Sequence, residues 1–198
     1  MTKQRICATT FLLICCLIGA FFVLDEPPVT DMGTQGSSVE DFDIILIAGR
    51  SIRSRFVRWF GSGSAEWSHV GVLHTNDGQV YILHATPDIR DGNAIQYEPI
   101  DILLKRKAVS RFRVIRLPEL VPEQQEAVEV RFERIRAESL PFDYTFTMQD
   151  NGSIYCSELV LKIFPELICS LDISRTIYPG VFNELTNRII IIDSSTTR

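Results

Sequence analysis

The tripeptide Asn76-Asp77-Gly78 lies between two stretches of β-forming residues, 69–75 and 79–86, and constrains the fold more than any other feature of this chain. Asn and Asp followed by Gly tolerate the positive backbone angles of a tight hairpin turn. The two stretches are therefore predicted to pair as antiparallel neighbours. The chain must contain an antiparallel sheet, and the turn sets how residues of the two strands face one another.

This turn also predicts which histidines share a face of the sheet. With two residues in the turn, Gly71 lies opposite His84, and the alternation of side chains puts His69 and His84 on one face. Their Cα atoms are then diagonal neighbours about 7 to 8 Å apart, so the two rings can share a hydrogen bond. His74 points to the other face. Because Gly71 has no side chain, we expect it to leave room for the His84 ring.

Cys156 stands where an extended segment meets a helical pattern of apolar residues. Free N–H groups and the positive end of the helix dipole favour a thiolate at such a position. A cysteine hydrolase needs a thiolate, a base that moves the proton and a group that orients the base. Cys156, His69 and His84 match these roles in that order. The backbone N–H of Cys156 is also a natural donor to the oxyanion of a tetrahedral intermediate.

Other interpretations of these residues stay open. A single histidine in a sheet is often structural, and a single buried cysteine often only fills apolar space. His69, His84 and Cys156 also match the ligand types of a catalytic zinc ion, although no short-spaced ligand pair accompanies them. A disulfide between Cys156 and Cys169 would consume the thiol and would have to span most of a helix. Two histidines on one face favour catalysis, without a metal or other cofactor.

The N-terminus combines two basic residues, Lys3 and Arg5, with a run of nineteen uncharged residues, 6–24. A helix of this length spans about 28 Å, close to the thickness of a bilayer core of about 30 Å. Since the positive charges precede the run, the N-terminus is expected in the cytoplasm and the rest of the chain outside it. We predict a signal anchor over residues 1–24. A cleaved signal peptide with a secreted product is the alternative, although no small-x-small pair marks a cleavage site.

The remaining chain divides into a linker and one domain. Residues 25–40 are rich in Pro, Gly, Ser and Thr and predict a flexible linker. Residues 41–198 are enough for one domain, given a chain that is 45% hydrophobic and 23% charged. The net charge of −5 argues against nucleic acid as a partner, because a phosphate backbone selects basic surfaces.

Strands and helices alternate irregularly within this domain. Besides the hairpin, the pattern predicts strands at 42–48 and 110–117 and a buried strand at 189–192. It predicts helices at 51–60 and 122–140 and a third that begins near Cys156. This order predicts an α+β domain with an antiparallel sheet packed on helices.

Four separated motifs follow one another along the domain. They are Asp43-Ile-Ile-Leu, Trp67-Ser-His69-Val-Gly-Val, Val80-Tyr-Ile-Leu-His84-Ala, and Phe142-Asp-Tyr-Thr-Phe with Tyr155-Cys156-Ser-Glu-Leu-Val. In order and spacing they resemble the permuted papain-like amidases of the YaeF/YiiX type, which belong to the NlpC-type cysteine peptidase superfamily and are related to the lecithin:retinol acyltransferase-like enzymes. The resemblance extends from about residue 41 to the C-terminus.

The resemblance implies a circularly permuted papain-like fold, in which the base histidine precedes the cysteine. His69 matches the base of the family, Cys156 its nucleophile, and His84 the third position, where relatives carry Glu or His. The resemblance also implies a hydrophobic pocket beside the active site.

The resulting prediction is a membrane-tethered cysteine hydrolase that cleaves an amide or ester bond through an acyl-thioester. Its partners would be a lipid-like or peptide amide substrate and, through the N-terminal apolar run, the membrane. A lipid acyltransferase and a non-catalytic module that binds lipid or cell-wall peptide remain as alternatives.

Overall fold

The computed structural model describes residues 29, 31–50, 66–87, 92–107, 109–118, 121–171 and 176–195. The predicted signal anchor at 1–24, with its apolar run at 6–24, and the predicted helix at 51–60 lie outside these residues. Within the described ranges, no helix combines the length and the hydropathy needed to cross a membrane.

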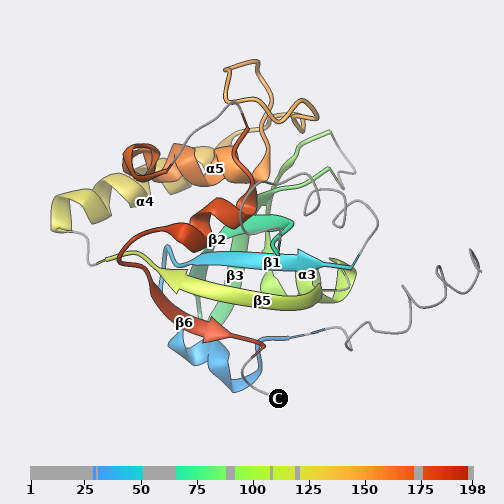
Figure 1. Ribbon diagram of the computed structural model, residues 1–198, viewed down its shortest axis with the longest axis vertical. Helices are drawn as coiled ribbons and strands as arrows, with labels where there is room; N and C mark the ends of the chain where they lie inside the picture. The colour runs from blue at the N-terminus through green and yellow to red at the C-terminus, as the bar shows by residue number, and fades with distance from the viewer. Residues whose placement is uncertain are drawn as a thin grey trace, which may run out of the picture.

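Within these described residues, six strands form one antiparallel sheet in the order β4-β3-β2-β1-β5-β6 (Figure 1). All six residues of the central strand β1 are buried, because layers of structure cover both faces of the sheet there. The strands are β1 (Ile44–Gly49), β2 (His69–Asn76), β3 (Gln79–Ala85), β4 (Ile95–Pro99), β5 (Val109–Arg116) and β6 (Ile189–Asp193).

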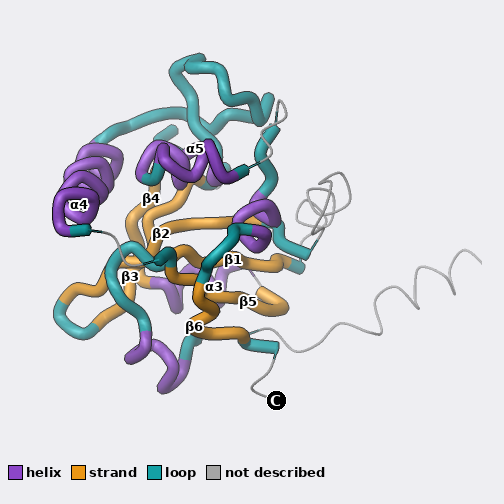
Figure 2. Tube along the Cα trace, turned by 60° about the vertical axis from the view of Figure 1, so that its left-hand side comes forward, coloured by secondary structure: helices purple, strands orange, loops and turns teal. Residues whose placement is uncertain are grey.

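Helices pack on both faces of this sheet. The α-helices are α3 (Ile100–Lys107), α4 (Pro122–Ala137) and α5 (Cys156–Ile163), and short 3-10 helices are η1 (Gly33–Ser38), η2 (Pro165–Ser170) and η3 (Pro179–Glu184). In Figure 2, α4 and α5 lie side by side above the sheet. The buried apolar residues of these two helices belong to one core cluster, whereas those of α3 belong to another.

The alternation of side chains along β1 shows how the sheet separates the two clusters. Ile44 and Leu46 pack in the cluster that contains Phe132 of α4. Ile45, between them, packs in the cluster that contains Leu104 of α3. A strand with apolar residues at every position is expected when both faces are buried. The continuous apolar run at 44–48, within the predicted strand at 42–48, therefore indicates a central strand.

The hairpin forms in the predicted register. Asn76 lies opposite Gln79, and His74 lies opposite Tyr81. The turn residues Asp77 and Gly78 have φ angles of 50° and 76°, the left-handed pair of a type I′ turn.

The side chain of Ile82, and not that of His84 as predicted, occupies the space beside Gly71. A Cβ atom added at Gly71 would lie 2.6 Å from Cδ1 and 2.7 Å from Cγ1 of Ile82. The side chain that requires a glycine at this position is therefore Ile82, and not His84. Both residues lie on the same face of β3, and Ile82 is the diagonal neighbour that leans over Gly71.

The last strand differs from its prediction. Ile189 and Ile190 are 54% and 48% exposed, and only Ile192 of the isoleucine run is buried. The reason is the position of β6 at the edge of the sheet, where no other described strand pairs with its outer side. A run of isoleucines by itself does not distinguish an edge strand from a central one.

Part of the predicted linker packs against the domain. Residues 33–38 form η1, and the flanking Met32 and Val39 are buried in the cluster that contains α3. These two apolar side chains, in an otherwise small and polar segment, fix residues 31–40 to the sheet.

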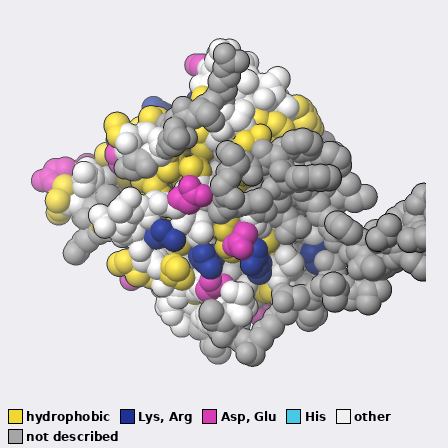
Figure 3. Space-filling model, viewed as in Figure 1, with side chains coloured by type: hydrophobic (Ala, Val, Ile, Leu, Met, Phe, Trp, Pro, Cys, Tyr) yellow, Lys and Arg dark blue, Asp and Glu magenta, His cyan; other side chains and the backbone are white. Residues whose placement is uncertain are grey.

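The strand β5 carries arginines that pair with acidic residues. Arg116 donates from Nε to Asp43 Oδ1 at 2.8 Å, and Arg113 pairs with Asp193. Figure 3 shows basic and acidic side chains interleaved across the middle of this face. The acidic groups neutralise the β5 arginines locally, so this face is not a basic patch.

Candidate active site

The rings of His69 and His84 contact each other directly. His69 Nε2 and His84 Nδ1 are 2.8 Å apart, and the two rings stand nearly perpendicular, at 89°. His69 lies at the start of β2 and is partly exposed, whereas His84 on β3 is fully buried. The structure thus brings these two predicted site residues together, on one face and as diagonal neighbours.

His74 lies on the opposite face, as its position in the hairpin predicts. Its Nδ1 atom is 2.8 Å from the hydroxyl of Tyr97, and its ring stacks on Phe132 of α4 with 5.4 Å between centroids. His74 is therefore a packing residue beneath α4.

Cys156 is the first residue of α5, as predicted, and the residue before it, Tyr155, is extended. The thiol is buried, and the backbone N–H of Val70 on β2 donates a hydrogen bond to it. The ladder between β2 and β3 ends at the pair Val72 and Leu83, so this N–H lies beyond the last paired residues. The thiol therefore occupies a point where the two strands separate.

This contact places the thiol next to the backbone of His69. The N–H of Val70 belongs to the peptide group that directly follows His69. Cys156 is consequently within one hydrogen bond of the backbone of His69. The Cys156 thiol and the pair of His69 and His84 therefore lie at the same end of the hairpin, away from its turn.

The surroundings of Cys156 oppose its ionisation. Burial raises the pKa of the Cys156 thiol and outweighs the hydrogen bonds that lower it, from the Val70 amide and from Ser157. The helix start was expected to favour the thiolate, but this effect is smaller than the cost of burying the charge. A thiolate at this position therefore needs a neighbouring base.

A fourth residue, Glu98 of β4, extends the histidine pair. Its Oε1 atom accepts a hydrogen bond from His84 Nε2 at 3.0 Å. The guanidinium of Arg106 on α3 donates to both carboxylate oxygens, at 2.5 and 3.0 Å. Burial raises the pKa of Glu98, but the bonds and charges of His84 and Arg106 more than offset this effect, so the pKa lies below its usual value.

The sequence interpretation missed Glu98 because it did not predict β4. A signal was present in the alternation of apolar Ile95 and Tyr97 with polar Gln96 and Glu98, which ends at a proline. That alternation puts Glu98 on the same face of the sheet as His84, which lies opposite Gln96.

The loop that leads into α5 is organised by Asp143. One carboxylate oxygen accepts hydrogen bonds from the backbone and hydroxyl of Thr145, at 2.7 and 2.6 Å, and the other accepts from the backbone of Thr147 at 3.1 Å. A bridge between Phe142 and Ile154 holds the two ends of this loop together. The loop thereby delivers Cys156 to the sheet in a defined position.

A second buried acid, Glu158, lies one residue beyond Ser157 on α5. Burial raises the pKa of Glu158, and Lys162 at 3.4 Å lowers it by a smaller amount. Asp143 acts in the same direction as burial, through its negative charge. The two acidic side chains thus interact with each other, one from the loop that precedes α5 and one from α5 itself.

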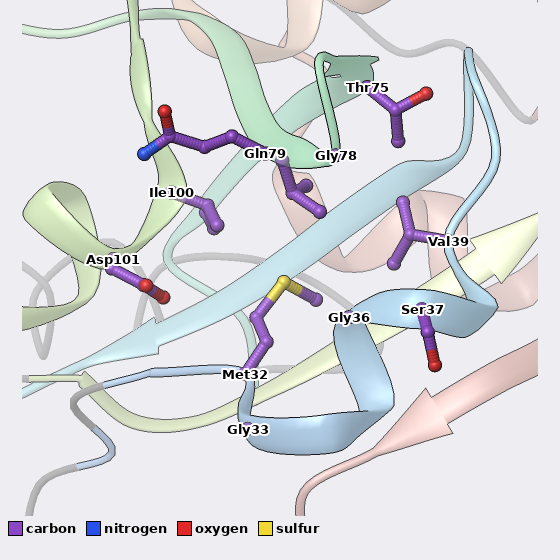
Figure 4. A pocket seen from close by; sticks show the side chains of 11 residues that line it. Met32, Gly33, Gly36, Ser37, Val39, Thr75, Gly78, Gln79, Ile100 and Asp101 are labelled. Atoms are coloured by element: carbon purple, nitrogen blue, oxygen red, sulfur yellow. The ribbon is translucent and has the colours of Figure 1, made fainter.

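One cavity in the described part of the structure lies away from Cys156. It measures about 540 Å³ and is found between η1, the start of α3 and the turn of the hairpin (Figure 4). Met32, Val39, Val80 and Ile100 form part of its apolar lining, and Gly78 lies at its rim. His69 stands at the other end of β2. This cavity is therefore distinct from the hydrophobic pocket that was expected beside Cys156.

The structure thus combines an antiparallel sheet, a hairpin that carries a pair of histidines and a cysteine at the start of a helix. Residues 39–194 match the family described as permuted papain-like amidase enzyme, YaeF/YiiX, C92 family. The chain belongs to this family, as the four sequence motifs predicted. Its members are papain-like amidases or peptidases.

A solved structure supports the fold. The chain is similar to a structure described as metalloprotein yiiX from Escherichia coli O157:H7, with a TM-score of 0.61 and 18% sequence identity. The similarity covers 79% of this chain and 98% of the other. No curated protein sequence matches the chain.

The described residues do not fit a metal ion. Over the described ranges, no group of three or more His, Cys, Asp or Glu side chains is arranged to hold one. The facing nitrogens of His69 and His84 share a hydrogen bond and so do not point at a common ion. The zinc interpretation of His69, His84 and Cys156 therefore has no support in this geometry.

Proposed function

We propose that the protein is a cysteine hydrolase in which Cys156 is the nucleophile, His69 the base and His84 the residue that orients the base. One observation carries the proposal: the hydrogen-bonded pair of His69 and His84 stands at the strand end where the Val70 amide holds the Cys156 thiol. This arrangement matches the needs of a thiol enzyme, because a buried thiol with a raised pKa is inert without a base.

The proposed reaction has two halves. His69 takes the thiol proton, and the sulfur attacks the carbonyl carbon of an amide or ester. The Cys156 N–H stabilises the resulting oxyanion. When the tetrahedral intermediate collapses, the bond to the leaving amine or alcohol breaks and the imidazolium returns the proton to that group. Water then attacks the acyl-thioester, with His69 as its base, and releases the carboxylic acid and the free thiol.

The proposed substrate is a lipid-like or peptide amide at a membrane surface. The apolar run at 6–24 supports this proposal, since it has the length and composition of an anchor. An anchor with the preceding basic residues in the cytoplasm would place the domain on the outer side of that membrane.

An acylating probe tests the proposal directly. The full-length protein is incubated with an activated ester, and the acylated cysteine is located by mass spectrometry. We expect acylation at Cys156 and at least a hundredfold loss of turnover in His69→Ala. Cys156→Ala should show no labelling at position 156, and in His84→Ala the acylation of Cys156 should be slow.

Two variants serve as controls. His74→Gln changes the histidine on the other face, and Cys169→Ala removes an exposed thiol. Both should retain acylation at Cys156, with unchanged circular dichroism. Turnover that persists without Cys156 would refute the proposal. Added amine or alcohol acceptors distinguish hydrolysis from acyl transfer by the product that forms.

A further inference from the structure

We infer that Glu98 is a positioning residue of the site, which acts on Cys156 through His84 and His69. It supplies the negative charge that a histidine in the third position lacks. This inference rests on the proposed function, because it assigns Glu98 a part in forming the thiolate.

The four side chains form a continuous row across adjacent elements. His69 on β2 contacts His84 on β3, His84 contacts Glu98 on β4, and Glu98 contacts Arg106 on α3. The heavy-atom distances along this row are 2.8, 3.0 and 2.5 Å. Strand pairing sets the diagonal step from His84 to Glu98, since Ile82 lies opposite Glu98. The row is thus a product of the sheet register.

The row determines where the ring protons lie. An ionised carboxylate only accepts hydrogen bonds, so His84 must donate from Nε2 to Glu98. A neutral His84 then accepts at Nδ1, and His69 must donate from Nε2. This arrangement leaves Nδ1 of His69 as its basic nitrogen. The carboxylate therefore selects the tautomer in which His69 can take the thiol proton.

The row also provides charge. When His69 takes the proton of Cys156, the histidine pair becomes positive, and a buried cation needs a negative partner. Glu98 is only 14% exposed and His84 is fully buried, so their interaction is weakly screened. Arg106 opposes the effect, but it is 40% exposed and solvent screens its charge. We expect the nearer, buried carboxylate to dominate.

Few other charged groups face this row among the described residues. Cys156 approaches from α5, and Arg106 from α3. Asp143 and Glu158 lie on the Cys156 side, in the preceding loop and on α5. The variants proposed below leave both acids unchanged, so differences between the variants report on Glu98.

The test measures alkylation of Cys156 by iodoacetamide as a function of pH. The full-length protein is used, and the peptide that contains Cys156 is quantified by mass spectrometry, so that other cysteines do not contribute. Glu98→Gln keeps an oxygen that accepts from His84 but removes the charge. We expect its alkylation near pH 7 to be about tenfold slower than that of the unmodified protein, which equals one pKa unit.

The pH profile separates charge from structure. The difference should disappear as the pH rises toward the ionisation of the thiol by itself, because the imidazolium is no longer needed there. Glu98→Asp, which keeps the charge, should recover most of the rate. Glu133→Gln, which breaks a glutamate–arginine pair on α4, is the matched control and should leave the profile unchanged.

For Arg106→Gln the expected change in the alkylation rate of Cys156 has the opposite sign. This prediction can be tested even if the Glu98→Gln variant fails to fold. Removal of the positive charge should leave alkylation equal or faster, because the histidine pair keeps its carboxylate. If Arg106→Gln and Glu98→Gln both slow the alkylation of Cys156, by the same factor as each other and at every pH, the row has only a structural role and the inference is overturned.

The outcomes also distinguish this inference from the proposed function. Equal alkylation in His69→Ala and the unmodified protein would refute the proposed function itself. Slow alkylation in His69→Ala together with an unchanged Glu98→Gln profile would refute only the role of Glu98.

Discussion

Cys156 is held between two opposing effects. Burial disfavours its thiolate, whereas the amide of Val70 and the hydroxyl and amide of Ser157 favour it. Since burial prevails, it favours the protonated thiol, and in the proposed mechanism His69 takes the proton. The position of a cysteine at a helix start is consequently not enough to make it reactive. In the proposed mechanism, reactivity depends on the hydrogen-bonded side chains that β2, β3 and β4 contribute.

Asp143 provides a test at the same scale. Its hydrogen bonds with Thr145 and Thr147 outweigh burial and hold its pKa below the ordinary value of 3.8. A lowered carboxyl pKa stabilises the folded state above about that pH, and the contribution is lost as the pH falls through the folded-state pKa. In Asp143→Asn, an NH₂ group replaces one of the two carboxylate oxygens. The N–H of Thr147 then faces this NH₂ group or lacks an acceptor. We expect a loss of about 1 to 3 kcal/mol in the free energy of unfolding at pH 7.

Urea unfolding at several pH values measures this effect. The difference between Asp143→Asn and the unmodified protein should shrink below about pH 4, where the native carboxyl also becomes protonated. Asp150→Asn changes an exposed acid near the same loop and should alter stability by less than about 0.5 kcal/mol. An equal free energy of unfolding at pH 7 for Asp143→Asn would contradict the role assigned to its hydrogen bonds.

Among the elements, those with a strong local signal were predictable. The turn at Asp77 and Gly78 fixed the hairpin register, and an alternation with a period of two residues then paired His69 with His84. The β4 and α3 elements were missed because the patterns in residues 92–107 are short and Pro99 interrupts them. Glu98 was lost with them.

The contact between the Cys156 thiol and the Val70 amide, in contrast, could not be predicted from a local pattern. How a helix docks on a sheet depends on the packing of many side chains at once, and no local pattern encodes it. From the sequence, the meeting of cysteine and histidine was therefore an expectation supported by resemblance. The exposure of Ile189 likewise depends on the order of the strands.

The hairpin turn itself supplies the second test. Gly78 has a φ of 76°, and an added Cβ would meet no atom within 4 Å. Gly78→Ala should therefore cost only the backbone strain of a left-handed residue, about 1 kcal/mol. Gly36→Ala is the matched control, because its added Cβ would make ordinary contacts of 3.9 Å. Chemical denaturation of both variants checks this, and equal stability of the two would contradict the turn assignment.

At the scale of the whole molecule, the site joins two layers. His84, Glu98 and Arg106 belong to the face of the sheet that carries α3, since Ile82 on the same face packs in that cluster. Cys156 belongs to the cluster of α4 and α5. The two layers meet where the ladder between β2 and β3 ends. A working site therefore requires both layers to stay folded on one sheet.

This architecture predicts additive stability effects across the sheet. Ile135 of α4 and Ile45 of β1 are both fully buried, but in different clusters. Ile135→Val and Ile45→Val should each cost about 1 kcal/mol, and the double variant should equal their sum within about 0.5 kcal/mol. Leu73 and Ile82 lie directly opposite each other within one cluster. Leu73→Ala and Ile82→Val should therefore deviate from additivity by more than 0.5 kcal/mol, as neighbours do.

Urea titrations followed by tryptophan fluorescence and by circular dichroism measure both pairs. We expect one transition with coincident midpoints for every variant, because each layer is stable only on the shared sheet. Two separate transitions, or strong coupling between Ile135 and Ile45, would show that the layers are not arranged as independent clusters on a single cooperative sheet. In that event the distance between Cys156 and the histidine row would vary with partial unfolding, and the alkylation rate of Cys156 would change before the main transition.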